Sequence, residues 1–235
     1  PATFEAICFG DTQPRNQEEV DFIAHDIVEE LVGHPAKLGM TLGDVVFNDL
    51  TMFEPLARNI ALIGVPWYNI LGNHDMDFDA PETRLAYDTF TRVFGPHYYA
   101  FNVANVHFLV LNNVYWDTTT REYHAEFGAE QLAFVKNDLA LATRDAPAFM
   151  INPTSLADAP DPPALLELLA PFPHTFSLSA HWHRQKHYFM GPEFGWNGAT
   201  PHHHLVHFTA CGSWWSGMKD ERGIPHATMS DGGPN

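Results

Sequence analysis

The sequence contains few cysteines, few basic residues and no long apolar run. Its two cysteines, Cys8 and Cys211, each lie in an apolar, strand-like stretch, and two such positions do not form a disulfide framework. We therefore expect free, buried thiols. No stretch approaches the roughly 18 to 20 apolar residues that cross a bilayer, so we expect no membrane span. The 12 basic residues face 29 acidic ones, for a formal charge of -17, which argues against nucleic acid as a partner.

What the chain does contain is enough apolar material for a sizeable core. It has 235 residues, of which 45% are hydrophobic, and this length fits one large α/β domain. We treat residues 1–235 as a single domain. The chain begins at Pro1, with neither an initiator Met nor a charged and then apolar leader. We expect that a targeting segment or an upstream region has been removed.

Strand-like and helix-like segments alternate through the first part of the chain. Apolar runs at 4–9, 36–42 and 65–71 are typical of strands, and the intervening segments 16–33 and 50–63 have apolar residues at helical spacing. Such alternation is typical of parallel βαβ units and predicts an α/β sheet.

After a further helix predicted at 81–94, the pattern changes. The runs 98–103 and 106–111 are separated by Ala104-Asn105 and predict an antiparallel hairpin. The remaining predicted elements are helices at 129–143 and 163–170 and strands at 148–151, 175–179, 186–190 and 205–210.

Potential metal ligands follow several of the predicted strands. The most informative motif is Gly72-Asn73-His74-Asp75, because it follows an apolar run and carries side chains suited to metal and proton chemistry. In open α/β sheets the ligand site lies beyond the carboxyl ends of the strands, where residues far apart in sequence converge. A mixed set of oxygen and nitrogen ligands suits Mn, Zn or Fe. The other potential ligands that follow an apolar run are Asp11, Gln13, Asp44, His181 and His183.

Each of these motifs also has an ordinary structural interpretation. A Gly-Asp pair after a strand is more often a turn or a helix cap, and this holds separately for Asp11 and Asp44. Asn-His-Asp in a loop is often a polar turn, and His-x-His is often a pair of packed or surface histidines. The occurrence of all these motifs in one chain favours a shared site.

A pair of metal ions at such a site suits chemistry on a phosphate. Two divalent cations bring four positive charges, and Asp11, Asp44 and a bridging hydroxide remove three, which leaves about one positive charge for an anionic ester. His74 adjoins the ligand Asn73 and is predicted to stabilise the transition state or to protonate the leaving oxygen. Asp75 is predicted to orient His74.

These motifs resemble those of the calcineurin-like metallophosphoesterase superfamily, and the resemblance covers nearly the whole chain. It implies an α/β fold, namely a four-layer α/β/β/α sandwich with two mixed β-sheets, and two divalent metal ions at the carboxyl ends of the strands. His74 matches the family's catalytic histidine. The resemblance also implies a ligand set: Asp11, Gln13 and His183 for one metal, Asn73 and His181 for the other, and Asp44 as a bridge.

A later part of the chain resembles a bacterial subgroup in which this catalytic domain lies between accessory domains. The segments concerned are 210–217, Gly223-Ile224-Pro225 and Met229-Ser230-Asp231-Gly232. The resemblance implies that the chain is a fragment of a longer multidomain protein. It favours a periplasmic or secreted location, with a cytoplasmic one as the alternative.

Two positions depart from the family's commonest pattern. The first motif usually reads Asp-x-His, whereas this chain has Gln13, a weaker and neutral ligand that related subgroups also use. The family also supplies a His just before a Pro, where this chain reads Ile151-Asn152-Pro153. Depending on register, Ile151 removes a ligand from the second metal, or Asn152 replaces it weakly through its amide oxygen. We therefore expect the second metal to bind less tightly.

Histidines and tryptophans elsewhere also invite a functional interpretation. In His202-His203-His204, strand alternation places the first and third side chains on one face and the second on the other. We expect a structural or supporting role for His204, with direct contact to substrate or metal as the alternative. Candidate aromatic walls of the substrate cleft are Trp182, Trp214 and Trp215, the last two with core packing as the alternative.

The sequence thus predicts a metal-dependent phosphoesterase that hydrolyses a phosphate mono- or diester with a hydroxide activated by two metal ions. The alternative is a catalytically weak or inactive module that binds metal or a phosphoryl group through an impaired second metal site. The negative charge disfavours a nuclease of the same superfamily. The expected partner is a small phosphorylated substrate, whose identity depends on loops such as 116–128 and 191–201.

Overall fold

The first three strands of the chain form a parallel sheet. In the computed structural model, which describes residues 3–226, β1 (Ala6–Phe9), β2 (Leu38–Thr41) and β3 (Trp67–Asn69) lie in the order β1-β2-β3. Both neighbouring pairs are parallel, so the carboxyl ends of these strands meet at one edge. Helical segments connect them, as the alternating apolar pattern predicts.

A larger sheet has the strand order β10-β11-β9-β8-β5-β4. The β4–β5 and β10–β11 pairs are antiparallel, and the pairs between them are parallel. The predicted α/β fold is confirmed, but within residues 3–226 this six-stranded sheet is mixed whereas the three-stranded sheet is parallel and not mixed as predicted. The strands are β4 (Tyr99–Val103), β5 (Val106–Val110), β8 (Ala148–Ile151), β9 (Thr175–Ser179), β10 (Lys186–Met190) and β11 (His202–Val206). The last of them begins and ends earlier than the predicted strand at 205–210.

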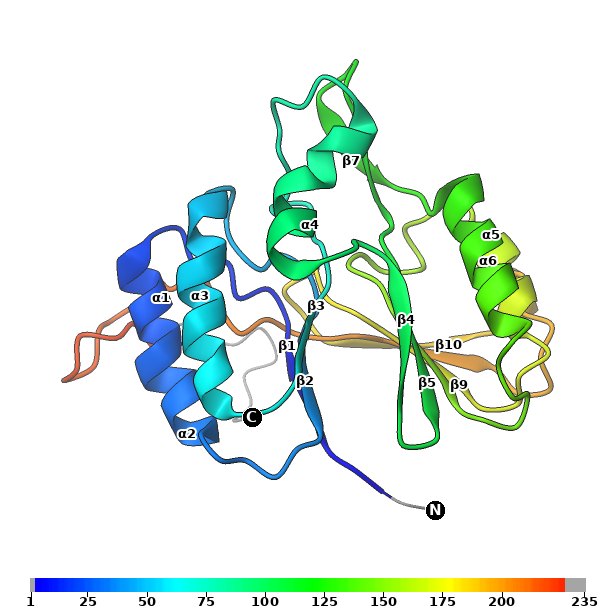
Figure 1. Ribbon diagram of the computed structural model, residues 1–235, viewed down its shortest axis with the longest axis horizontal. Helices are drawn as coiled ribbons and strands as arrows, with labels where there is room; N and C mark the ends of the chain where they lie inside the picture. The colour runs from blue at the N-terminus through cyan, green and yellow to red at the C-terminus, as the bar shows by residue number, and fades with distance from the viewer. Residues whose placement is uncertain (1–2, 227–235) are drawn as a thin grey trace.

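Helices cover the outer faces of both sheets (Figure 1). On the three-stranded sheet, Asn16 caps the first helix, and its side chain accepts a hydrogen bond from the backbone N–H of Glu19 at 3.1 Å. The helical segments on this side are α1 (Gln17–Ile23), a π-helical turn (Ala24–Val28), α2 (Glu29–Leu31), α3 (Phe53–Ile60) between 3-10 turns at Leu50–Met52 and Ala61–Ile63, and α4 (Asp88–Phe94) after a 3-10 turn at Thr83–Tyr87. On the larger sheet they are α5 (Gly128–Leu139) and α6 (Pro162–Leu169).

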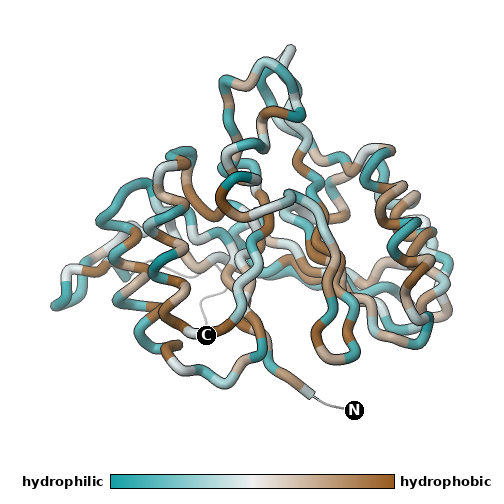
Figure 2. Tube along the Cα trace, viewed as in Figure 1, coloured by the Kyte–Doolittle hydropathy of each residue, from teal (hydrophilic) through white to brown (hydrophobic). Residues whose placement is uncertain are grey.

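Three apolar clusters hold these layers together. One joins α1 and α3 to β1, and another joins α5 and α6 to β5 and β8. The third lies between the sheets and includes Met40 and Ile70 from one side and Phe108 and Ile151 from the other. Burial of a large apolar side chain of this kind contributes roughly 1.5 to 3 kcal/mol. Figure 2 shows hydrophobic residues along the central strands and mostly hydrophilic residues in the peripheral loops.

A short hairpin stands at the end of the molecule toward which β1, β2 and β3 run (Figure 1). It consists of β6 (Val114–Asp117) and β7 (Glu122–Ala125), which pair antiparallel. The segment 116–128 is predicted as a loop, whereas the structure has the end of β6 and all of β7 within it. The prediction is wrong for these residues. It lies at the edge where the strand ends meet.

Cys8 and Cys211 are both free thiols, as predicted, although only Cys211 is buried and Cys8 is half-buried. Within residues 3–226, no helix has the length and apolar character needed to span a membrane. The signature at Met229-Ser230-Asp231-Gly232 lies outside the described residues.

Candidate metal centre

The predicted ligands lie on loops that follow β1, β2, β3 and β9. The backbone N–H of Gln13 donates to the carbonyl oxygen of Asp44 at 3.2 Å, which joins the first two loops. The backbone N–H of His181 donates to Asp11 Oδ2 at 3.0 Å, which joins strand ends from the two sheets. The structure therefore brings together loops that are far apart in the sequence.

Five of the six predicted ligands have a left-handed backbone conformation. The φ angle is 39° at Asp11, 42° at Gln13, 48° at Asp44, 71° at His181 and 50° at His183. A non-glycine residue adopts such a φ rarely, at a cost on the order of 1 to 3 kcal/mol. Backbone strain of this kind is concentrated at functional sites, where neighbouring contacts hold each side chain in one direction.

Gly72 makes room for the loop that carries Asp44. A Cβ atom at Gly72 would lie 2.0 Å from the backbone nitrogen of Asp44 and 2.2 Å from Asp44 Oδ1. The same carboxylate oxygen accepts a hydrogen bond from the backbone N–H of His74 at 3.0 Å. The first residue of the Gly-Asn-His-Asp motif must therefore be glycine because of this close approach.

An open cavity of about 610 Å³ lies over these loops. Asp11 does not line it, because its side chain is buried and bonded to the backbone of His181. The predicted site residues that line the cavity are Gln13, Asp44, Asn73, His74, His181 and His183.

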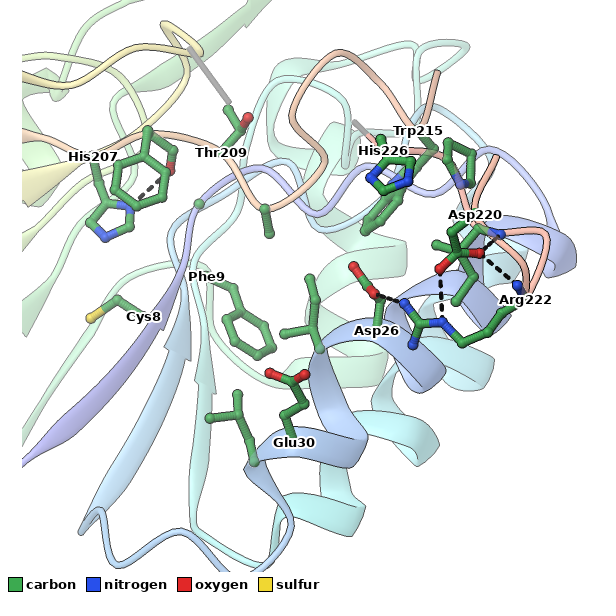
Figure 3. A pocket seen from close by; sticks show the side chains of 17 residues that line it. Cys8, Phe9, Asp26, Glu30, His207, Thr209, Trp215, Asp220, Arg222 and His226 are labelled. Atoms are coloured by element: carbon green, nitrogen blue, oxygen red, sulfur yellow. Dashed lines mark hydrogen bonds and ion pairs between the residues drawn. The ribbon is translucent and has the colours of Figure 1, made fainter. Parts of the chain in front are cut away.

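A larger cavity, of about 700 Å³, lies elsewhere, beside β1 and the first helices (Figure 3). Among the described residues that line it, none is a predicted ligand. Its Arg222 is paired with Asp26 at 2.5 Å and with Asp220 at 2.8 Å, as the dashed lines in Figure 3 show. The guanidinium charge is thus already matched by two carboxylates. Side-chain chemistry, and not cavity size, identifies the candidate site.

Asp11 and Asp44 place two carboxylates in a buried setting. Burial, and then the negative charge of Asp44, raise the pKa of Asp11 well above its ordinary value. A divalent cation at this position would oppose both effects, because positive charge favours the ionised form of Asp11. The electrostatics of the pair therefore suit a cation site.

Buried oxygens without a hydrogen-bond partner complete the donor set. Among the described residues, Asn73 Oδ1 and Asn152 Oδ1 are buried and accept no hydrogen bond. Leaving such an oxygen unpaired costs about 1 to 3 kcal/mol, and binding to a metal ion would satisfy it. Within residues 3–226, no group of three or more His, Cys, Asp and Glu side chains is arranged to hold a metal ion. A metal centre here therefore needs the amide oxygens as well, and with them the donor set fits Mn, Zn or Fe.

Gln13 is bonded to the predicted bridging residue. Its Nε2 donates to Asp44 Oδ2 at 3.0 Å, and its Oε1 lies 3.7 Å from the Sγ of Cys211. The oxygen that would bind a metal thus faces the thiol. A half-turn of the amide would exchange the two atoms and point the oxygen toward Asp44.

The structure distinguishes between Ile151 and Asn152 as the residue that stands at the position of the expected histidine. Ile151 is fully buried in the cluster between the sheets, so its side chain points away from the ligand loops. Asn152 is the first residue after β8, and its Oδ1 is unpartnered. The carbonyl oxygen of the next residue, Pro153, accepts from the N–H of Ala180 at 3.1 Å, directly before His181. Asn152, and not Ile151, therefore lies on the loop that contacts the His181 loop, although it is buried and does not line the cavity.

His74 lines the cavity with its ring held on two sides. Its Nδ1 lies 2.7 Å from Asn48 Oδ1, and the ring of Phe47 stacks on it with centroids 4.4 Å apart. Burial lowers the pKa of His74, whereas the charge of Asp44 acts in the opposite direction. When Nδ1 donates to Asn48, the atom left for other partners is Nε2.

Asp75 does not orient His74, which corrects the role predicted for it. Its buried carboxylate accepts hydrogen bonds from the backbone N–H groups of Val45, Val46 and Gly72, at 3.0, 3.0 and 2.8 Å. These bonds fasten the loop after β2 to the loop after β3. Asp75 thus positions the loops that carry the ligands.

Trp182 and His204 do not line the cavity. This corrects the prediction of Trp182 as a substrate contact, whereas the structural role expected for His204 agrees with its burial. His204 is fully buried, with Nδ1 2.8 Å from Ser177 Oγ and Nε2 3.2 Å from Ser179 Oγ. Because His204 is not exposed, a ligand cannot contact it, and its role is structural. The indole Nε1 of Trp182 donates to Asp158 Oδ2 at 2.8 Å instead.

Several residues of the cavity were not identified from the sequence. Asn48, which contacts His74 but does not line the cavity, was also missed, and its only signal is that asparagine tolerates the left-handed conformation it adopts, with φ of 67°. Trp214 lines the cavity, whereas Trp215 is in the core. The lining residues that were missed are Arg15, Phe47, Tyr123, Ser213 and Ser216.

Comparison with known families agrees with this geometry. The profile described as "Calcineurin-like phosphoesterase" matches residues 6–185, which is more than half of the chain. The profile described as "C terminal of Calcineurin-like phosphoesterase" matches residues 204–235. The chain therefore belongs to the calcineurin-like phosphoesterase family, whose members are metal-dependent phosphoester hydrolases.

A solved structure of low sequence identity shares the fold. A dimetal phosphatase from Danio rerio, LOC 393393, superposes with a TM-score of 0.63 at 12% identity, over 89% of this chain and 88% of that one. Two further structures match less closely. TT1561 of Thermus thermophilus gives a TM-score of 0.49 at 12% identity, over 90% and 92% of the two chains. The phosphopantetheinyl hydrolase PptH from Mycobacterium tuberculosis gives 0.48 at 11% identity, over 86% and 87%. No curated protein sequence matches the chain.

Proposed function

We propose that this chain hydrolyses a small phosphorylated substrate, a phosphate mono- or diester, with the help of two divalent metal ions. One observation carries the proposal: the Asp44 carboxylate, side-chain amides and imidazoles from separate strand ends meet at one open cavity beside His74. The family membership and the dimetal phosphatase among the similar structures support it.

The donor set suggests how the residues are divided. Bound metal ions supply positive charge to the phosphate oxygens and lower the pKa of a coordinated water. We assign Asp44 between the two ions, because its carboxylate lies against both the Gln13 loop and the His74 loop. The remaining assignments are Asp11, Gln13 and His183 for one ion and Asn73, His181 and Asn152 for the other.

His74 is the residue we assign to proton transfer or to contact with the transferring phosphoryl group. The bond to Asn48 and the stacking of Phe47 fix the ring, so Nε2 is the atom that would face a phosphate or leaving oxygen. Positioned acid–base groups of this kind accelerate reactions by about 10² to 10⁴-fold.

A second candidate function is a catalytically weak or inactive module that binds metal or a phosphoryl group. The neutral side chain of Asn152 favours it, because an amide oxygen holds Zn or Fe less strongly than an imidazole does. In that case the second metal site is impaired, and the cavity binds metal or a phosphoryl group but does not hydrolyse a phosphoester.

The test is hydrolysis of p-nitrophenyl phosphate and bis(p-nitrophenyl) phosphate after loading with Mn, Zn or Fe. The wild-type chain is expected to release nitrophenol. His74→Ala is expected to lose about 10² to 10⁴-fold in rate with its metal content nearly unchanged, because His74 is not a ligand in this proposal.

His25→Ala serves as the matched control, since the side chain of His25 is 60% exposed, is paired with Glu29 and does not line the cavity. It should retain full activity. Loss of metal in His74→Ala would show that His74 is a ligand. Absence of turnover by the wild-type chain with every metal would favour the inactive module.

The periplasmic or secreted location and the accessory domains predicted from the sequence are also proposals. Detection of the natural protein in a periplasmic fraction would support the first.

A further inference from the structure

The mouth of the candidate site is walled by aromatic rings. Phe47, Tyr123 and Trp214 all line the cavity, and they come from three separate segments of the chain. Trp214 is 44% exposed and Tyr123 is 39% exposed, which places both among the exposed large apolar side chains of the described residues. Exposed aromatic surface at a cavity mouth is typical of a binding site for a flat or apolar group.

Trp214 is held in a fixed position. Its backbone is left-handed, with φ of 53°, and its carbonyl oxygen accepts a hydrogen bond from Arg15 at 2.6 Å. One face of its ring stacks on His183, with centroids 4.5 Å apart. The Oγ of Ser216 donates to the carbonyl oxygen of Ser213 at 2.5 Å and closes the turn that carries the indole. Such a preorganised ring loses little entropy when a ligand stacks on it.

The same cavity offers little side-chain charge for a second phosphate. Among the described residues that line it, Arg15 is the one with a permanent positive charge. Its guanidinium is paired with Glu19 at 2.7 Å, and the same group bonds to the carbonyl of Trp214. Selectivity beyond the reacting phosphate must therefore come from the aromatic walls and not from further charge pairing.

We infer that the cavity selects a phosphoester with a single phosphoryl group whose alcohol part carries a planar aromatic ring, and that this ring packs against Trp214. The inference rests on the proposed function for the position of the phosphate. It adds the chemical class of the alcohol part of the ester, which carries an aromatic ring. Trp214 is then the specificity-determining residue, and Tyr123 and Phe47 complete the walls.

The first arm of the test compares 2-naphthyl phosphate with glycerol 2-phosphate. Base–aromatic stacking measured in other proteins corresponds to roughly tenfold effects, so Trp214→Ala should lower kcat/KM for the naphthyl ester about tenfold. The loss for the glycerol ester should be about tenfold smaller than the loss for the naphthyl ester, because any change at His183 affects both esters alike and only the naphthyl ring stacks on Trp214. Trp214→Phe should recover most of the loss. Phe189→Ala is the matched control, since Phe189 is 65% exposed on β10 and does not line the cavity. It should leave kcat/KM unchanged for both esters.

The second arm measures binding without turnover, by calorimetry with naphthylphosphonate and methylphosphonate on the metal-loaded chain. The naphthyl compound should bind about tenfold more tightly to the wild-type chain, and Trp214→Ala should abolish that preference. If hydrolysis fails but this preference holds, the proposed function is wrong and the aromatic subsite stands. Equal losses for both esters in Trp214→Ala, or equal affinities for both phosphonates in the wild-type chain, would overturn the inference.

Discussion

Asn152 is the residue at which the chain departs most clearly from the pattern that its motifs resemble. Its Oδ1 is buried without a hydrogen-bond partner, and it follows a strand whose last residue, Ile151, belongs to the core. An unpaired amide oxygen is costly unless something binds it. A metal ion next to His181 would do so, although a neutral oxygen binds it less strongly than an imidazole.

Replacing Asn152 tests this assignment. Asn152→His should tighten the weaker metal site at least about tenfold, or about 1.4 kcal/mol, because it supplies an imidazole at the same place. Ile151→His is the matched control: its side chain would enter the core between the sheets, lower stability by a few kcal/mol and leave metal affinity unimproved. Equilibrium dialysis with Mn²⁺ and thermal unfolding measure the two quantities. Equal metal affinities for Asn152→His and wild type would refute the assignment.

At the scale of elements, much of the fold was predictable because strands such as β2 and β5 are buried on both faces. Such strands read as continuous apolar runs, as at 36–42, and the helices between them show a clear 3.6-residue period. The cap at Asn16 and the hairpin of β4 and β5 were also predictable from local turn and cap chemistry. Placement of ligands after strand ends then follows from topology.

The elements that sequence reasoning missed depend on long-range contacts. β7 is an exposed strand with polar side chains such as Glu122 and His124, so it lacks the apolar alternation that marks a strand. β11 begins at His202. The ring of His202 is buried there because the hydroxyl groups of Thr175 and Ser177 form hydrogen bonds with it. The role of Asp75 depends on three backbone N–H groups, two in the loop after β2 and one in its own loop, and no local pattern specifies the first two contacts.

At the scale of the whole molecule, the buried histidines of β11 link stability to pH. His202 and His204 point to the same side and are both buried, as alternation predicts, and both contact Ser177 Oγ of β9. Burial, followed by the charges of neighbouring histidines, lowers the pKa of His204 to about 3. Burial, followed by the charge of His203, lowers the pKa of His202 to about 4.

These shifts predict that acid destabilises the fold. Below about pH 6.5 the unfolded chain takes up protons at these histidines while the folded chain does not, so the unfolded state is favoured. The free energy of unfolding should be fully retained above pH 6.5 and should fall as the pH drops toward about 3. The loss from His204 alone is on the order of a few kcal/mol. Urea unfolding between pH 7 and pH 4 measures it.

His204→Gln is expected to flatten this pH dependence, even though it lowers stability at neutral pH. His25→Gln should leave the slope unchanged, since His25 lies on the surface. A slope that is equally steep in His204→Gln and wild type would show that other groups carry the acid sensitivity.

The central claim is that the ligand loops hold two metal ions that support phosphoester hydrolysis. The most direct measurement is the number of Mn, Zn or Fe ions retained per chain after equilibrium dialysis, taken on the same sample whose turnover of p-nitrophenyl phosphate is recorded. Our account predicts two equivalents, one held less tightly, together with turnover. At most one equivalent and no turnover under any metal would contradict it.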